Sequence, residues 1–272
     1  MDTGLADKVV VVTGATANIG KGIALAFAAE GAKVVVVGRD TEAGKRVLDA
    51  AREHGAADVL WRATDVTVED EVRGMVADVV ARFGRVDVLV NTVGGSADIA
   101  PFAESTRESW TADIDLNLVS TLLCTHAVLP HMLEQGTGRI VNIGSMAGII
   151  GDRLMAVYSA AKGAVHAFTR VLALELGSSG ITVNAVAPYA TRSDDPDEQF
   201  STGSRYHPEH GMLAAAIRER PDDLRTMMRP TALPRQRALP SEIGAAAVYL
   251  ASDRAAFVTG QVHQVDGGVV LV

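Results

Sequence analysis

The sequence has a single cysteine, Cys124, among its 272 residues. An intrachain disulfide is therefore impossible, and so is a metal centre held by several thiolates. Such cysteine usage is typical of a reducing compartment. Aromatic residues are also scarce, at 4% of the chain, so a hydrophobic core must consist mainly of Val, Ala, Leu and Ile.

Basic residues are fewer than acidic ones, 25 Lys and Arg against 33 Asp and Glu, which gives a formal net charge of −8. This balance argues against nucleic acid or an anionic membrane as a general partner. No apolar run is long enough to cross a bilayer, and the start, MDTGLADKVVVVTGATANIG, lacks the pattern of a secretory signal. We therefore expect a soluble, cytoplasmic protein without a membrane partner.

Short, Val-rich runs alternate with helical patterns along the chain. Continuous apolar runs predict strands covered on both faces, at 8–14, 33–39, 58–61, 86–91, 138–145, 181–188 and 260–268. The helical patterns include 23–31, ended by Gly31, and 67–84, with Thr67 as N-cap and Gly84 at its end. This repetition predicts an α/β fold: one domain over 1–272 with a doubly wound parallel sheet of about seven strands and helices on both faces.

One segment, 189–237, departs from this alternation. It has five prolines, many charges, no predicted strand, and two short helical patterns at 211–220 and 221–229. It follows the carboxyl end of a predicted strand, the edge at which ligands of such sheets bind. We therefore predict a substrate lid within the domain, with a poorly ordered surface insertion as the alternative. His207 and His210 suggest a metal, but without cysteine or a fixed carboxylate shell we predict none.

The turn between the first predicted strand and helix is rich in glycine. In VVVVTGATANIG, Gly14, Asn18 and Gly20 lie where backbone N–H groups and a helix N-terminus can hold a pyrophosphate. The spacing is wider than in the usual dinucleotide fingerprint, and Asn18 occupies its middle glycine position. Asn accepts a positive φ more readily than most residues, so the turn can still form. Such a turn alone is weak evidence for a nucleotide.

Tyr158 and Lys162, in YSAAK, are four residues apart and project from one face of a helix. A phenol with a pKa of about 10 is a poor base at neutral pH, and a nearby ammonium lowers that pKa. The pair can then move a proton to or from an alcohol or carbonyl oxygen. Ser145 offers a hydroxyl to the same oxygen. A Tyr-x-x-x-Lys pair by itself is common and usually lies on the surface.

Together these elements resemble the classical short-chain dehydrogenase/reductase family, whose glycine pattern is TGxxxGxG. The resemblance runs from about residue 7 to the C-terminus and includes TDV (64–66), NTVGG (91–95), SWTADIDLNL (109–118), NAVAP (184–188) and PSEIGAAAVYLASDRAAFVTGQVHQVDGG (240–268). It implies a Rossmann-type fold and an oxidoreductase that interconverts a secondary alcohol and a ketone with NAD(P)(H). Dihydrodiol dehydrogenation, other chemistry of this family, and a nucleotide-binding protein without catalysis are the alternatives.

The resemblance implies four catalytic residues. Tyr158 is the acid/base, Lys162 binds the ribose hydroxyls and lowers the tyrosine pKa, Ser145 orients the substrate, and Asn117 holds a relay water. No metal is implied.

Cofactor contacts are also implied. Asp65 would bind the adenine amino group, Val66 the adenine ring, and Asn91 the adenosine ribose; as an alternative, Asp65 caps a helix. The remaining implied contacts are Gly14, Thr16, Asn18, Ile19, Gly20, Gly94, Pro188, Thr191 and Ser193. The family usually has glycine after the proline of NAVAP, where this chain has Tyr189, and we favour Ser193 over Thr191 as the hydroxyl near the carboxamide.

The residues after the second predicted strand bear on the choice of cofactor. Gly38 stands where a carboxylate would bind the ribose hydroxyls of NAD(H) and repel a 2′-phosphate. Arg39 follows and can pair with that phosphate, although Asp40 partly offsets its charge. We favour NADP(H) over NAD(H), the alternative being a solvated Arg39. The resemblance also implies a homotetramer or a dimer. The tail VDGGVVLV and the residues Ala160, Ala161 and Ala164 are compatible with close subunit packing, and a place in the internal core is the alternative.

Overall fold

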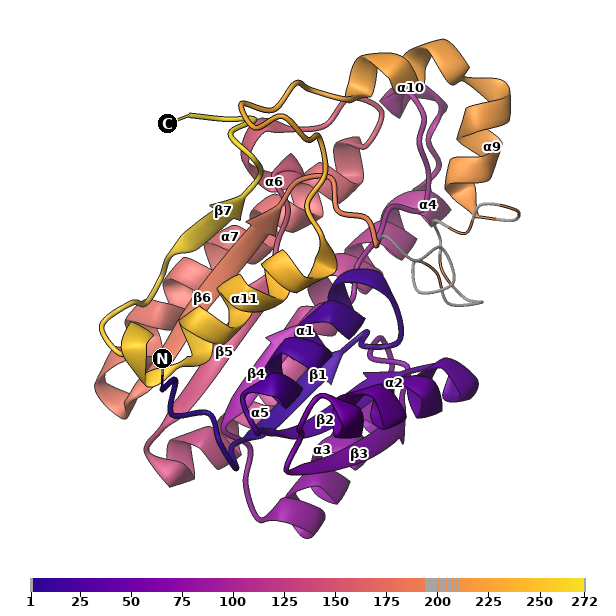
Figure 1. Cartoon of the computed structure of the whole chain (residues 1–272). Helices are drawn as coiled ribbons and strands as arrows, with labels where there is room; N and C mark the ends of the chain where they lie inside the picture. The colour runs from indigo at the N-terminus through magenta and orange to yellow at the C-terminus, as the bar shows by residue number, and fades with distance from the viewer. Residues whose placement is uncertain are drawn as a thin grey trace.

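The computed structural model describes residues 2–193, 200, 204, 207, 209 and 211–271. Seven parallel strands form one sheet in the order β3-β2-β1-β4-β5-β6-β7, which confirms the predicted architecture (Figure 1). The strands are β1 (Val9–Thr13), β2 (Lys33–Gly38), β3 (Asp58–Ala63), β4 (Val88–Asn91), β5 (Gly138–Ile143), β6 (Ile181–Pro188) and β7 (Val262–Val265). The strand order reverses between β1 and β4, and the crevice at such a reversal is where open α/β sheets bind ligands.

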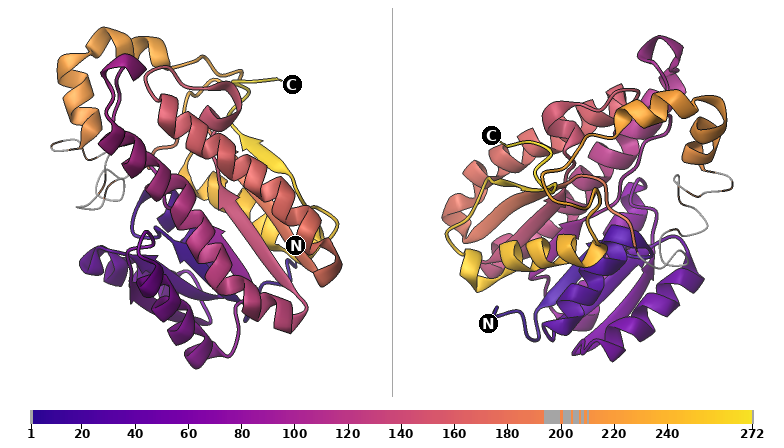
Figure 2. Two further views of the ribbon diagram at one scale, coloured as in Figure 1. Left: turned by 180° about the vertical axis from the view of Figure 1, so that it is seen from behind. Right: turned by 45° about the horizontal axis from the view of Figure 1, so that its top comes forward.

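Helices cover both faces of the sheet (Figures 1 and 2). One face carries α1 (Asn18–Ala29), α2 (Thr41–Glu53) and α11 (Pro240–Ala251), and the other carries α3 (Glu69–Phe83), α5 (Ser120–Gln135) and α7 (Ala156–Leu176). Val10 and Val12 of β1 pack with the first group, whereas Val9 and Val11 pack with the second. Because successive side chains of a strand point to opposite faces, an unbroken valine run fills both cores.

Helices α4 (Arg107–Ile114) and α5 are joined by a π-helical turn, Asp115–Val119, into one run over 107–135. Among the described residues, this run alone is long and apolar enough to cross a membrane by length and composition, whereas the sequence predicted no such run. It packs against β4, β5 and α3, as a core helix of the sheet does. The remaining short elements are η1 (Phe102–Glu104), α6 (Ala147–Ile150), η3 (Gly177–Ser179) and η4 (Asp253–Ala255).

The predicted N-cap of α3 is wrong. The helix begins at Glu69 after Val68, and the backbone N–H and hydroxyl of Thr67 both donate to Asp65 Oδ1, at 3.0 and 2.7 Å. Asp65 therefore closes a turn ahead of the helix, and the N-cap lies one residue later than predicted, at Val68. Gly84, with a φ of 75°, ends α3 as predicted.

The segment 189–237 contains α9 (Met212–Glu219) and α10 (Pro221–Met227), close to the two predicted helices. Both lie against the loops that precede α4 and α7 (Figure 1). Arg220 pairs with Glu104, and Arg153 pairs with Asp223 at 2.8 Å. Residues 194–199, 201–203, 205–206, 208 and 210 of the predicted lid, His210 included, lie outside the described residues.

Candidate active site

The turn between β1 and α1 has the geometry of an anion cradle. Gly14 has a φ of 64° and Asn18 a φ of 42°, so Asn18 adopts the positive φ expected of it. A Cβ on Gly20 would lie 2.1 Å from the main-chain oxygen of Gly14, so only glycine fits there. Helix α1 starts at Asn18, and its N-cap Ala17 supplies no side-chain acceptor. The first N–H groups of the helix are therefore oriented to bind a phosphate.

Unsatisfied polar atoms lie around the same turn. Within the described chain, Asn18 Oδ1, Asn91 Oδ1 and Thr92 Oγ1 are buried and have no hydrogen-bond partner. A buried polar atom normally has a partner, so these acceptors fit a polar ligand such as a dinucleotide. The amide nitrogen of Asn91 is already engaged, by Thr125 Oγ1 at 3.0 Å and Asn142 Oδ1 at 2.9 Å. Thr92 was missed in the sequence because a lone threonine after a strand carries no signal.

At the end of β2, Arg39 Nη1 lies 3.6 Å from Asp65 Oδ2. Partial burial raises the pKa of Asp65, but the hydrogen bonds from Thr67 and the charge of Arg39 outweigh it and hold that pKa below its usual value. Asp40 accepts a hydrogen bond from the Ala43 N–H at 3.0 Å and caps α2. The arginine predicted for a phosphate thus adjoins the aspartate predicted for adenine.

Three other predicted cofactor residues mainly shape the walls of this region. A Cβ on Gly38 would lie 2.7 Å from Thr16 Cγ2, so the two residues are in close contact and a larger residue at 38 would have to displace Thr16. Val66 is buried in the core on the α3 face, and Ile19 packs against the core on the α1 face.

Helix α7 carries both Tyr158 and Lys162. The Lys162 side chain is buried, its Nζ donates to the main-chain oxygen of Ile143 at 2.9 Å, and it lies 6.0 Å from the centroid of the Tyr158 ring. Burial lowers the pKa of Lys162 to about 8. A buried ammonium beside a phenol favours the phenolate, because opposite charges attract more strongly away from water.

Asn117 belongs to the π-helical turn and meets Lys162 at Gly94. Its Oδ1 accepts from the Gly95 N–H at 3.0 Å, and its Nδ2 donates to the main-chain oxygens of Gly95 and Asp113, both at 2.9 Å. A Cβ on Gly94 would lie 2.8 Å from both Asn117 Oδ1 and Lys162 Nζ. The NTVGG segment therefore touches two predicted catalytic residues, and the side chain of Asn117 is occupied by backbone.

Ser145 lies two residues beyond the end of β5 and is half-buried. Its Oγ accepts from the Ala147 N–H at 3.1 Å, which leaves the hydroxyl hydrogen to donate elsewhere. Its own N–H donates to Nε2 of His166 over a long 3.4 Å. His166 was not singled out in the sequence, although it follows Lys162 by one helical turn.

The carboxyl end of β6 is Pro188, followed by Tyr189. The hydroxyl of Tyr189 accepts from the Arg229 N–H at 2.7 Å, and Arg229 Nη2 donates to the main-chain oxygen of Gly151 at 2.9 Å. Thr191 Oγ1 donates to the main-chain oxygen of Tyr189 at 3.3 Å. Ser193 is the last residue described before position 194. Tyr189 thus links β6 to the residues after α10.

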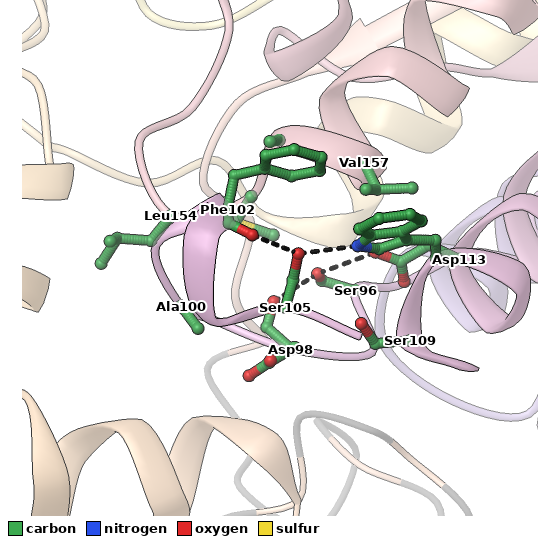
Figure 3. A pocket seen from close by; sticks show the side chains of 12 residues that line it. Ser96, Asp98, Ala100, Phe102, Ser105, Ser109, Asp113, Leu154 and Val157 are labelled. Atoms are coloured by element: carbon green, nitrogen blue, oxygen red, sulfur yellow. Dashed lines mark hydrogen bonds between the residues drawn. The ribbon is translucent and has the colours of Figure 1, made fainter. Parts of the chain in front are cut away.

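An apolar cluster forms the wall beside Tyr158. Its buried members are Ile99, Leu154, Met155 and Ala216, and Tyr158, Leu224 and Met227 pack against them. Next to it, a small pocket lies between the loop before α4 and the start of α7 (Figure 3). Trp110 stacks on Phe102 there and donates to Ser105 Oγ at 2.7 Å. Among the described residues, no group of three or more His, Cys, Asp or Glu side chains is placed to hold a metal ion.

The seven-stranded parallel sheet and the glycine-rich turn after β1 are those of a Rossmann-type fold. A family model described as short chain dehydrogenase matches residues 8–202. The chain belongs to the short-chain dehydrogenase/reductase family, an enzyme family that generally uses NAD(P) cofactors.

Relatives match along nearly the whole chain. A 3-oxoacyl-[acyl-carrier-protein] reductase of Synechocystis sp. is 37% identical over 99% of both chains. A cis-4-hydroxycyclohexanecarboxylate dehydrogenase of Sinomonas cyclohexanicum is 38% identical over 100% of both. The crystal structure of a short-chain dehydrogenase/reductase from Burkholderia xenovorans superposes with a TM-score of 0.81 at 33% identity and covers 97% of each chain. The protein is an oxidoreductase.

Proposed function

We propose that the enzyme interconverts a secondary alcohol and a ketone with NAD(P)(H), and that Tyr158 is its general acid/base. The observation that carries this proposal is the buried Lys162, which lies beside the Tyr158 ring and meets Asn117 at Gly94. A buried ammonium is costly unless it is paired or hydrogen-bonded, and groups with perturbed pKa values cluster at functional sites.

The nicotinamide, when bound, supplies or accepts the hydride. The Tyr158 hydroxyl donates its proton to the ketone oxygen, or as phenolate takes it from the alcohol. Lys162 stabilises the phenolate and binds the ribose hydroxyls. Ser145 donates a hydrogen bond to the same substrate oxygen, because its Oγ already accepts from the Ala147 N–H. Asn117 holds the Gly95 backbone with its side-chain amide, and a relay water would donate to an acceptor lone pair that Asn117 has left.

We propose NADP(H) rather than NAD(H) as the preferred cofactor. Gly38 offers no carboxylate against a 2′-phosphate, and a larger residue there would clash with Thr16. Arg39 is 60% exposed and lies 3.6 Å from Asp65, so its guanidinium can reach a phosphate at the cost of a weak, partly exposed ion pair.

The substrate side supports a ketone or alcohol with an apolar body. The wall beside Tyr158 is formed by aliphatic side chains from the loop before α7 and from α9 and α10. These contacts are the basis for assigning a substrate role to the segment 189–237. The name of the Sinomonas relative specifies a cyclic secondary alcohol, which is compatible with such a wall.

We also propose a homotetramer or a dimer. Ala161 is buried in the chain's own core, whereas Ala160 is exposed and Ala164 is half-buried, so these three do not form one outer face. Large apolar side chains that are exposed on the isolated chain, and available for packing, include Val171, Leu174 and Phe257. Light scattering on a gel-filtration column measures the assembly directly.

Turnover of reduced cofactor tests the function. Purified protein is mixed with NADPH or NADH and with cyclohexanone, acetophenone or ethyl acetoacetate, and the loss of reduced-nicotinamide absorbance is followed. We expect turnover with at least one ketone and a loss of about a hundredfold or more in Tyr158→Phe. Full turnover in Tyr158→Phe would refute the acid/base assignment, and cofactor binding without turnover of any carbonyl or alcohol would favour other family chemistry.

A further inference from the structure

His166 is a buried imidazole to which the proposed chemistry gives no role. It is 2% exposed and lies on α7, eight residues after Tyr158 and four after Lys162. Residues at this spacing share one helix face, so His166 continues the face that carries the catalytic pair. That face meets the loop 144–148, which carries Ser145.

The loop packs directly on the imidazole through two glycines. A Cβ on Gly144 would lie 2.1 Å from His166 Nε2, and a Cβ on Gly148 would lie 2.9 Å from His166 Cε1. The same Cβ on Gly148 would also lie 2.6 Å from the main-chain carbon of Lys162. The glycines on both sides of Ser145 therefore allow the loop to pack directly against the His166 ring.

The polar contacts specify how the ring is used. The Ser145 N–H donates to Nε2 at 3.4 Å, so Nε2 is an acceptor and the proton of the neutral ring resides on Nδ1. Burial, then the charges of Lys162 and Arg170, lowers the pKa of His166 to about 4, against a smaller opposing effect of a Gly148 backbone hydrogen bond. The ring is thus neutral at physiological pH, as an acceptor must be.

We propose that His166 is a positioning residue for Ser145. Its Nε2 accepts from the Ser145 main-chain N–H, while the Ala147 N–H donates to Ser145 Oγ. With both ends of Ser145 fixed, its hydroxyl hydrogen is directed toward the substrate oxygen at Tyr158. This inference rests on the proposed function, because it assigns His166 a part in orienting a residue that binds substrate. A small displacement of such a group is sufficient to cost catalysis.

Two replacements of His166 separate the effect of its hydrogen-bond acceptor from the effect of its side-chain volume. His166→Leu keeps a similar bulk without an acceptor, and we expect kcat to fall by about ten- to a hundredfold. His166→Gln places an amide oxygen within reach of the Ser145 N–H, and we expect it to recover most of kcat. In both variants the affinity for NADPH, measured by cofactor fluorescence, should stay within about twofold of wild type. The matched control is His126→Leu on the exposed face of α5, and its affinity for NADPH should stay within the same range.

A double-mutant cycle distinguishes positioning from general support of the fold. In a Ser145→Ala background, His166→Leu should cause no further loss of kcat, because the group it positions is absent. An equal loss in both backgrounds, or wild-type kcat in His166→Leu, would overturn the proposal. The ketone in these assays is whichever of cyclohexanone, acetophenone and ethyl acetoacetate the wild type reduces fastest.

Nitrogen NMR of the full-length protein provides a test that needs neither a folded leucine variant nor turnover. The His166 imidazole, assigned by its absence in His166→Gln, should be neutral with its proton on Nδ1. A proton on Nε2 would refute the contact with Ser145. If the proposed function itself fails, the wild type reduces none of the three ketones, and the tautomer still decides whether His166 holds the serine backbone.

Discussion

The side-chain nitrogen of Lys162 donates a 2.9 Å hydrogen bond to the main-chain oxygen of Ile143, the last residue of β5. The contact joins α7, the helix of the proposed catalytic pair, to the strand that leads into Ser145. A lysine in this position is held in place by main chain, and it is removed from water, which disfavours its charged form.

The first prediction follows from the pKa of Lys162, which burial lowers to about 8 in the folded protein from an ordinary 10.5. Between these values the unfolded state binds one proton more than the native state, so the free energy of unfolding should rise with pH across this window. Urea denaturation of the cofactor-free protein at pH 8 and at pH 10 measures that rise. Lys162→Met should lack this component, whereas exposed Lys45→Met should retain it.

If wild type and Lys162→Met show the same pH dependence between pH 8 and pH 10, the buried amine does not titrate there. Because an apolar side chain avoids the desolvation of a buried charge, Lys162→Met should also be at least as stable as wild type at pH 7. A large loss of stability in that variant would show that the Ile143 contact outweighs the cost of burial.

The second prediction concerns Gly94, which separates Lys162 from Asn117. A Cβ there would lie 2.8 Å from both Lys162 Nζ and Asn117 Oδ1, so one of them must move in Gly94→Ala. We expect NADPH affinity and kcat each to fall by about tenfold or more, as measured by cofactor fluorescence and absorbance.

Gly74→Ala is the matched control, since an added Cβ there meets nothing within 4 Å on helix α3. It should leave activity unchanged and stabilise the protein by about 0.5–1 kcal/mol through helix propensity. Normal NADPH affinity and kcat in Gly94→Ala would mean that the contact of the NTVGG segment with Lys162 and Asn117 is not needed for catalysis.

Much of the fold is accessible from the sequence because its signals are local. The valine runs of β1 and β2 and the glycines after α1 and α3 specify strands and helix ends without reference to distant residues. The failure at Thr67 is also local, since Thr67 donates its backbone N–H and its hydroxyl to Asp65 in a turn ahead of the helix. A pattern of residue types alone does not reveal that this turn forms before the helix begins.

The site was only partly predictable, for a different reason. Tyr158 and Lys162 share a helix face wherever that helix lies in the fold. The contacts of Ser145 with His166 and of Tyr189 with Arg229, in contrast, join residues 21 and 40 positions apart. Those contacts depend on how loops close over the sheet. Asn91 illustrates the same limit, because its amide nitrogen faces Thr125 and Asn142 inside the protein.

The third prediction tests the cofactor preference through Arg39. In Arg39→Ser the dissociation constant for NADPH should rise by about tenfold or more, because a hydrogen bond to a charged group contributes about 1.5–3 kcal/mol. The constant for NADH, which has no 2′-phosphate, should change little. Arg52→Ser on α2, whose guanidinium pairs with Asp49 at 2.7 Å, is the control. Equal weakening of both cofactors, or of neither, would contradict the assignment of NADP(H).

The last prediction concerns Tyr189, which stands where the family usually has glycine. Its hydroxyl accepts the Arg229 N–H at 2.7 Å, and Arg229 in turn donates to Gly151 ahead of α7. Tyr189→Phe leaves that N–H without its acceptor, a change of about 1 kcal/mol or more. Because the linked residues lie on the substrate side, KM for the ketone should rise about fivefold while NADPH affinity is kept.

Tyr249→Phe, an exposed tyrosine on α11, controls for loss of a hydroxyl and should leave both constants as in wild type. Steady-state kinetics at saturating NADPH separates KM from kcat. If Tyr189→Phe weakens NADPH binding and leaves KM unaltered, then Tyr189 acts on the nicotinamide side of β6. The residues after α10 would in that case reach the substrate by contacts other than the Tyr189–Arg229 hydrogen bond.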